Sequence, residues 1–377
     1  MTKDSRSATS GEPEGWKREL QSIINRFNPL HARYPKGVSH KTQEDRAYFL
    51  FYAFRLLRIR PGKFKKLRPR NIGERHITYL VEYWVREGKA PGTLQAYLSI
   101  LRTFCNWLDK PGMVKKAEAY VSDPAFVARC YTAAQDKAWT AHGILPEEKI
   151  AEVKAFDLRV GVQLLLQHHF ALRVKEAIML RPRLAEVDGH VMLTSYTHTY
   201  KDVQAYVALT AMAIKRGTKG GRLRHVPIDT PGKRAALEEA KQLAEHEAAH
   251  LGNTDKSLAQ NLRRFYYVME RCGITQAQLG ITAHGQRHQY AGDLYEKVSG
   301  TPAPVRAGDR VDRQIDRAGR LVVAQHLGHA REGITGAYLG GIRRRAPETP
   351  AVEVRAPAEP AQQATDPCAA AKQGGAS

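Results

Sequence analysis

The sequence is short of cysteine and has no paired cysteine motif. Its four cysteines, Cys105, Cys130, Cys272 and Cys368, stand far apart, and none forms a Cys-x-x-Cys pair. Neither a disulfide framework nor a cysteine-based zinc site is therefore expected. A reducing compartment fits this pattern best.

Long apolar runs are also absent. No stretch approaches the roughly 18 apolar residues that a membrane span requires, and the polar start from Met1 to Glu14 has no apolar core of the kind found in signal peptides. We therefore expect a soluble, cytoplasmic protein that is not secreted.

Acidic residues are scarce relative to basic ones. The chain has 59 Lys and Arg against 38 Asp and Glu, a formal net charge of +21. Such an excess suits a polyanionic partner and favours nucleic acid, although a basic protein without such a partner remains an alternative. The 377 residues, 42% of them hydrophobic, suffice for two domains.

The first part of the chain predicts a small helical unit. Apolar residues recur at helical spacing in several stretches. The expected helices are Trp16–Phe27, Ala47–Phe54 (as a buried helix), Ile77–Val85 and Pro91–Leu108, the last with Thr93 as its cap. We expect a partly disordered N-terminal extension over 1–40 and a helical, DNA-binding domain over 41–125.

A basic loop follows the second of these helices. Seven Lys or Arg lie between Arg58 and Arg70, and each could neutralise a DNA phosphate. The DNA-binding candidates are Lys63, Lys65, Lys66, Arg68 and Arg70. A solvated charged loop, or one that docks on an acidic surface, is the alternative.

The second part of the chain mixes helices and strands. We expect a linker over 126–150, a second domain over 151–345 and a disordered Pro-rich and Ala-rich tail over 346–377. The expected helices are Val160–His169, Arg173–Leu180, Lys233–His250 and Leu258–Arg271, and the expected strands are His190–Thr194, Ala211–Lys215 and Arg222–Ile228. Gly217, Gly220 and Gly221 permit a hairpin turn between the last two strands.

Three short motifs carry the chemistry. They are Ala171-Leu172-Arg173-Val174-Lys175-Glu176, His284-Gly285-Gln286-Arg287-His288 and the stretch from Leu327-Gly328-His329 to Tyr338. Together they resemble the active-site boxes of the tyrosine recombinases, the phage integrase family. Tyr338 follows His329 by nine residues, the spacing that this family shows between its Leu-Gly-His box and its nucleophile.

The resemblance implies a fold and an activity. The fold would be mainly α with a small antiparallel β-sheet (α+β), arranged as a two-domain DNA clamp of a helical core-binding domain and a catalytic domain. The activity would be site-specific DNA recombination through a 3′-phosphotyrosine, integrating or excising a mobile element without metal, ATP or another cofactor. The implied partners are double-stranded DNA, further copies of the chain in a tetramer on paired sites, and accessory DNA-bending or directionality proteins. The setting would be the prokaryotic nucleoid.

The resemblance also assigns roles to residues. Cleavage of a phosphodiester by a side chain needs a nucleophile, positive charge around the phosphorus and an acid for the leaving oxygen. The implied catalytic set is Arg173, Lys219, His284, Arg287, His329 and Tyr338. In it Tyr338 attacks, the two arginines hold the phosphate and Lys219 protonates the leaving 5′ oxygen, with Lys215 and Lys201 as alternatives. Glu176 would orient Arg173, and His288 would have a supporting role.

Other readings use the same residues. His284, His288, His326 and His329 could be drawn as a zinc site, but none of these four histidines lies in a His-Glu-x-x-His motif. A type IB topoisomerase would share the tyrosine chemistry. A non-catalytic DNA-binding protein on the same scaffold is the alternative from another class.

The sequence departs from the family pattern at several places. Ala171 stands where Gly is usual. The long segment 298–319 reads as a surface insertion, and 195–210 as another. Beyond Tyr338, Pro347 and Pro350 follow Arg343-Arg344-Arg345 closely, which leaves only a short segment for docking on a neighbouring subunit.

Overall fold

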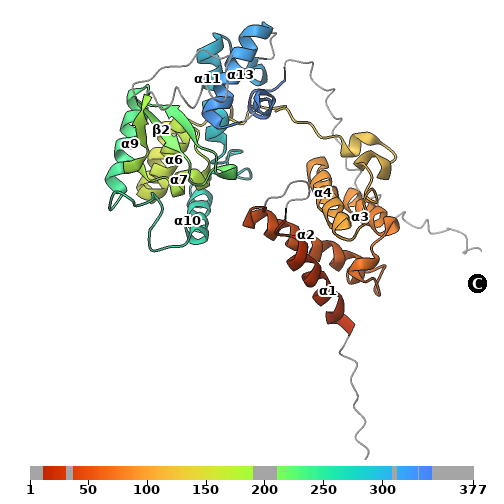
Figure 1. The fold of residues 1–377 in the computed structure, drawn as a ribbon. Coiled ribbons are helices and arrows are strands. Elements are labelled where there is room, and N and C mark those ends of the chain that lie inside the picture. Colours follow the sequence, from red (N-terminus) through yellow and green to blue (C-terminus); the bar gives the residue numbers. More distant parts are fainter. Residues whose placement is uncertain (1–11, 31–36, 190–209, 308–311, 330, 342–377) are drawn as a thin grey trace, which may run out of the picture. The chain divides into compact units, whose positions relative to one another are not determined.

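The computed structural model describes residues 12–30, 37–189, 210–307, 312–329 and 331–341. Within them the chain is mainly helical and contains one three-stranded antiparallel sheet, so the predicted fold class is confirmed (Figure 1). The predicted strand His190–Thr194, the predicted insertion at 195–210 (except Thr210) and the predicted tail 346–377 lie outside the described residues.

Four helices form the first part of the chain. They are α1 (Glu12–Phe27), α2 (His40–Arg58), α3 (Glu74–Arg86) and α4 (Pro91–Trp107). Ser39 caps α2 by accepting a hydrogen bond from the Thr42 amide at 3.3 Å. The predicted cap of α4 is wrong: Pro91 occupies the first turn, where its missing N–H costs nothing, and Thr93 lies inside the helix.

One hydrophobic cluster, with members from Trp16 to Val127, holds these helices together. Trp84, Phe54 and Phe104 are fully buried in it, and the Phe49 ring stacks on Tyr97 with centroids 4.5 Å apart. The run Ala47–Phe54 is buried on one face only, because Tyr48 is 80% exposed. The predicted buried helix is therefore present, and it buries one of its faces.

The second part of the chain contains the remaining helices and the sheet. The helices are α5 (Pro146–Phe156), α6 (Leu158–Phe170), α7 (Val174–Met179), α9 (Pro231–Leu243), α10 (Leu258–Arg271), α11 (Gly285–Ser299), α12 (Pro304–Ala307), α13 (Arg313–Leu327) and α14 (Gly336–Leu339). Short 3₁₀ turns lie at Pro69–Asn71, Ala117–Tyr120, Pro124–Val127, Thr140–His142, Pro182–Leu184, Lys219–Gly221 and Glu332–Thr335. Helix α9 ends at Leu243, earlier than predicted.

The sheet runs in the order β1 (Glu186–Asp188), β2 (Thr210–Ile214), β3 (Arg224–Pro227), each pair antiparallel. Met212 of β2 pairs with Glu186 on one side and Val226 on the other. Strands β2 and β3 confirm two predicted strands to within two residues. Strand β1 was not predicted, because three residues are too few to show an alternating pattern.

A residue of the predicted linker belongs to a hydrophobic core. Trp139 is fully buried among residues of α5, α6 and α10, and its indole N–H donates to the Thr282 carbonyl at 2.8 Å. The predicted domain boundaries stay predictions, but part of 126–150 packs with the second half of the chain.

The described residues of the segment 298–319 belong partly to α11, α12 and α13, and most of them are exposed, so the interpretation as a surface insertion stays a prediction. Arg306 of α12 donates to Asp136 at 3.0 Å and to Asp293 at 2.8 Å. Residues from Arg313 onward begin α13, where Asp316 is buried and accepts a hydrogen bond from the Tyr295 hydroxyl at 2.9 Å. Paired charges of this kind can be buried, although their sequence looks like that of an exposed loop.

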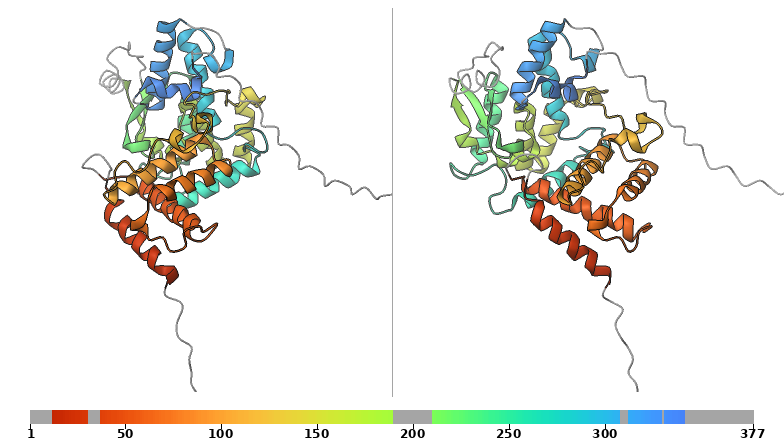
Figure 2. Two further views of the ribbon diagram at one scale, coloured as in Figure 1. Left: turned by 90° about the vertical axis from the view of Figure 1, so that its right-hand side faces the viewer. Right: turned by 45° about the vertical axis from the view of Figure 1, so that its right-hand side comes forward.

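Helices α11 and α13 lie side by side, as Figures 1 and 2 show. Helix α13 also contacts strand β3, and α14 contacts α11. The ends of these elements bring the three sequence motifs together. No helix of the described part of the chain is long and apolar enough to cross a membrane.

Candidate active site

A tight turn between α6 and α7 presents Arg173. Ala171 ends α6 in the left-handed region at φ 51°, a conformation that costs an alanine about 1 kcal/mol and a glycine almost nothing. This geometry explains why glycine is the usual residue here. Arg173 follows as the N-cap of α7.

Glu176 holds Arg173 from the first turn of α7. One carboxylate oxygen accepts a hydrogen bond from the Arg173 guanidinium at 2.6 Å, and the other accepts from the Arg173 amide at 2.9 Å. Burial alone would raise the pKa of the fully buried Glu176 carboxyl, but the charges of Arg224 and Arg173 outweigh burial and lower the pKa to about 2. Glu176 is therefore ionised at neutral pH.

Arg287 of α11 lies at the centre of the site. It is fully buried; its Nε donates to the Tyr338 hydroxyl at 3.2 Å, and its terminal nitrogens donate to the carbonyls of Ala171 and Leu327. Burial and the nearby charge of Arg224 lower its pKa to about 9, which leaves the guanidinium charged at neutral pH.

Three histidine rings surround Tyr338. The centroids of His288, His329 and His284 lie 4.7, 5.5 and 6.0 Å from that of Tyr338. His288 and His329 are buried, and burial together with nearby positive charge lowers their pKa to about 4 and about 3. These two imidazoles are neutral at pH 7.

The ring of His284 is the most open to solvent of the three. Its partial burial and the charges of Arg287 and Arg173 lower its pKa to about 4. Solvent that reaches the ring screens these charges.

The helix that carries Tyr338 is anchored at both ends. At its start, the Ala133 amide donates to the Gly336 carbonyl at 2.8 Å. At its end, Arg320 of α13 donates to the Gly340 carbonyl at 3.0 Å. Tyr338 itself is 8% exposed, so its hydroxyl is held in place and shielded.

Lys219 lies in the hairpin between β2 and β3, exposed to solvent. The base of this hairpin is fixed on α7: a Cβ built on Gly217, whose φ is +76°, would lie 2.6 Å from the Lys175 carbonyl. Thus the hairpin starts beside Arg173, while its tip is exposed. Lys215 is exposed as well, and Lys201 lies outside the described residues.

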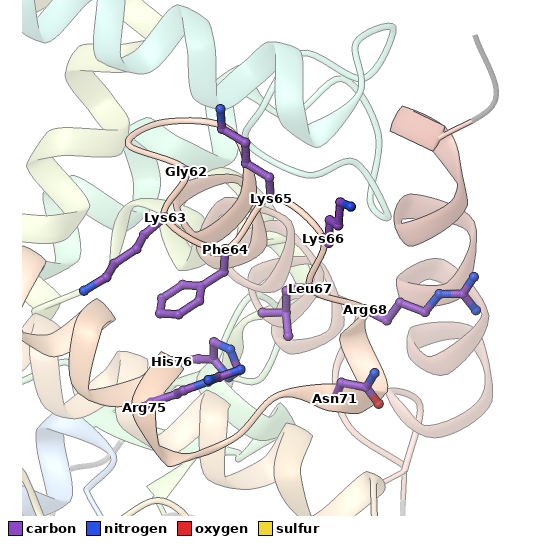
Figure 3. Close-up of a pocket in the computed structure, with 10 residues that line it drawn as sticks. All are labelled: Gly62, Lys63, Phe64, Lys65, Lys66, Leu67, Arg68, Asn71, Arg75 and His76. Carbon is purple, nitrogen blue, oxygen red and sulfur yellow. The ribbon is translucent and has the colours of Figure 1, made fainter. Parts of the chain in front are cut away.

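The predicted basic loop lines a hollow of about 500 Å³ in the first part of the chain. Figure 3 shows Phe64 and His76 in this hollow and the side chains of Lys63, Lys65 and Lys66 pointing in different directions from the loop. Arg68 and Arg70 are exposed too. Leu67 of the loop is buried, whereas Ile59 is exposed beside the charged side chains.

The structure brings together Arg173, His284, Arg287, His329 and Tyr338, as the sequence predicted, together with Glu176 and His288. It also adds a residue that sequence reasoning missed, Arg224, whose guanidinium lies 2.5 Å from the Glu176 carboxylate. Little in the sequence indicates it, because Arg224 stands next to His225 and two residues after Arg222, as an exposed cation would.

A second missed contact joins His326 Nδ1 to the Tyr290 hydroxyl at 2.7 Å. Within the part of the chain that the structure describes, no three His, Cys, Asp or Glu residues are grouped so that they could hold a metal ion. The arrangement is instead that of an anion site: two arginines, neutral imidazoles and a hydroxyl that could attack a phosphorus atom.

Comparison with known proteins agrees with this arrangement. Residues 136–293 match the family model described as "Integrase". No curated protein matches the chain.

Among solved structures, a lambda integrase dimer bound to a COC′ core site is similar at 15% identity and TM-score 0.49, covering 87% of this chain and 78% of that one. The Tn1549 transposon integrase in complex with transposon right end DNA is similar at 10% identity and TM-score 0.49, covering 85% and 94%. XerA recombinase is similar at 14% identity and TM-score 0.31, covering 85% and 94%. All three likenesses are distant.

Proposed function

We propose that the chain is a site-specific DNA recombinase of the integrase family, whose model its residues 136–293 match. It cuts and rejoins DNA through a 3′-phosphotyrosine on Tyr338, and it integrates or excises a mobile element in a prokaryotic cell. Its substrate is double-stranded DNA, on which several copies of the chain assemble into a tetramer.

The observation that carries this proposal is the hydrogen bond from Arg287 to Tyr338. A guanidinium 3.2 Å from the phenolic oxygen stabilises negative charge on that oxygen and, once DNA is bound, on the phosphate that it attacks. Arg173 supplies the second cation, because charge develops on both non-bridging oxygens of the phosphate. A buried tyrosine in a purely structural role would not need this cluster of positive charge.

The chemical step follows from these positions. The Tyr338 oxygen forms a bond to phosphorus while the bond from phosphorus to the 5′ oxygen breaks. Neutral His284 accepts the phenolic proton, and Lys219 gives a proton to the departing 5′ oxygen. The adduct keeps the energy of the broken bond, so a 5′ hydroxyl can reverse the step without ATP.

The first part of the chain supplies affinity in this proposal. The helices over 41–125 form the core-binding domain, and the exposed cations of the basic loop contact phosphates without reading sequence. Together with the catalytic domain over 151–345, this domain closes around the duplex.

The test is the detection of the covalent adduct. Purified protein is incubated with supercoiled DNA that carries the junctions of its own element, and the reaction is stopped with detergent. We expect protease-sensitive adducts on the 3′ phosphate at one defined site with the native protein and none with Tyr338→Phe, which retains DNA binding. Adducts that persist with Tyr338→Phe, or a native protein that binds these junctions without cutting, would contradict the proposal.

A further inference from the structure

Arg224 of β3 makes an unusual set of contacts beneath the active site. Its side chain is buried, and its Nη2 donates to Glu176 at 2.5 Å and to the Ala171 carbonyl at 3.3 Å. Its Nη1 donates to the His326 carbonyl at 2.6 Å and to the Phe170 carbonyl at 3.5 Å. One guanidinium thus contacts the end of α6, the start of α7 and the end of α13.

Each of these three places adjoins a residue of the proposed mechanism. Phe170 and Ala171 lead into Arg173, and Glu176 holds its guanidinium. His326 precedes the turn that ends in His329. A planar fork with several donors can satisfy acceptors on three elements at once, which the single ammonium of a lysine cannot do with the same geometry.

The stem of Arg224 also supports the Leu-Gly-His turn. Gly328 ends α13 at φ +66°, and a Cβ built on it would lie 2.6 Å from the Arg224 Cδ. The turn therefore lies directly on this side chain. The position of His329, the next residue, depends on the same contact.

We propose that Arg224 is a positioning residue for DNA cleavage, which acts by fixing Arg173, through Glu176, and His329 relative to one another. This inference rests on the proposed function. The burial of Arg224 makes it too remote to touch the DNA phosphate, so its effect is transmitted through the residues that it holds. Its charge also keeps Glu176 ionised, and an ionised Glu176 accepts both hydrogen bonds from Arg173.

The experiment compares Arg224→Met and Arg224→Lys with the native protein. Methionine keeps much of the apolar stem and removes the charge, whereas lysine keeps the charge and loses the fork. Arg222→Met is the matched control, because Arg222 lies two residues away and is exposed. Folding is checked by thermal melting and DNA affinity by titration, and the single-turnover rate of adduct formation is then measured.

We expect Arg224→Met to lose about 100-fold in cleavage rate, the scale of a small misplacement of reacting groups, with DNA affinity within about threefold of native. Arg224→Lys should cleave about 10-fold faster than Arg224→Met, and Arg222→Met should cleave at the native rate. These rates are then compared on DNA whose scissile phosphate is replaced by a methylphosphonate. A methylphosphonate has one negative charge fewer than a phosphate, so its cleavage depends less on the positive charge of Arg173. On this DNA the cleavage rate of Arg224→Met should therefore be only about 10-fold below that of the native protein.

Three outcomes would overturn the inference. The first is Arg224→Met cleaving at the native rate. The second is a loss of the same size on both DNA substrates, and the third is that neither variant folds, since Arg224 would then be only structural. If the native protein itself forms no adduct, the proposed function has failed instead, and the two failures are told apart by that first measurement.

Discussion

At the scale of single residues, two separate features of Gly328 exclude a side chain at this position. Its backbone is left-handed, and the stem of Arg224 fills the space where a side chain would begin. We expect Gly328→Ala to lower the free energy of unfolding by about 2 kcal/mol or more, the sum of the backbone strain and the overpacking. Urea denaturation measures this change.

Gly333→Ala is the control for that measurement. Gly333 has no neighbouring atom within 4 Å of a built Cβ, and its φ is not in the left-handed region. The free energy of unfolding of Gly333→Ala should stay within about 0.5 kcal/mol of that of the native protein. Equal losses in the two variants would show that Arg224 does not constrain position 328.

The buried histidines predict a dependence of stability on pH. Burial lowers the pKa of His329 to about 3 in the folded chain, while in the unfolded chain a histidine has a pKa of about 6.5. Below about pH 6.5 the unfolded state therefore binds more protons, and stability falls as the pH falls from about 6.5 toward 3. His329 alone should account for about 2 kcal/mol between pH 7 and pH 5.

Urea denaturation at several pH values tests this dependence. His329→Asn should show a shallower fall than the native protein, because it lacks one group that the folded state keeps neutral. His246→Asn, with an exposed side chain, should parallel the native protein. A native-like slope for His329→Asn would contradict the prediction.

At the scale of elements, α13 supports both the Leu-Gly-His turn and the helix of Tyr338. Arg320 pairs with the buried Asp316 at 2.7 Å and also donates to the Gly340 carbonyl. Arg320→Gln would leave a buried carboxylate without its charged partner, at a cost of about 3 kcal/mol in unfolding free energy. The rate of adduct formation should fall as well, because the end of α14 loses its anchor.

Arg317→Gln on the same helix is the matched control. Its side chain is 62% exposed and lies 3.5 Å from Glu332, an exposed pair of the kind that contributes less than about 1 kcal/mol. Chemical denaturation compares the two variants. An Arg320→Gln protein as stable as Arg317→Gln would mean that Asp316 does not depend on Arg320.

The elements differ in how far the sequence predicts them. Helices with a continuous apolar stripe, such as α10, match their predicted ranges, and strands β2 and β3 were found because glycines separate them. In the segment 298–319 the charged residues Arg306 and Asp316 suggest solvent, whereas each has a charged partner in the fold: Asp136 for Arg306 and Arg320 for Asp316. Local patterns cannot show a partner that lies far away in the chain.

The candidate active site could be predicted from the sequence only where its residues lie in local motifs. Arg173, Arg287, His329 and Tyr338 were identified because each lies in a short motif with a recognisable spacing. Arg224 lies in no such motif, and its partners Glu176 and His326 are 48 and 102 residues away. Its importance follows only from three-dimensional contacts.

At the scale of the whole molecule, the net charge of +21 implies DNA binding that weakens with salt. If Lys63, Lys65 and Lys66 each contact a phosphate, replacing all three with Gln should reduce the slope of log affinity against log salt by about 3. Binding titrations between low and physiological salt measure this slope.

Lys41→Gln is the control for the salt titration, because Lys41 is already paired with Asp45 at 2.6 Å. Its slope should equal that of the native protein. The triple variant should keep its rate of cleavage at saturating concentration, since none of the three lysines belongs to the proposed catalytic set. An unchanged slope in the triple variant would remove the loop from the DNA interface.

The anchoring of the β2–β3 hairpin at Gly217 has one more consequence. Lys219 lies two residues beyond a point fixed on α7, so its backbone can move no more than about 7 Å from that point. A tethered amine of this kind behaves like a reagent confined to a small volume, with an effective concentration far above that of any amine in solution. In the proposed role of Lys219 as the acid, the hairpin therefore needs no rigid fold of its own, because its attachment beside α7 already keeps the amine near the site.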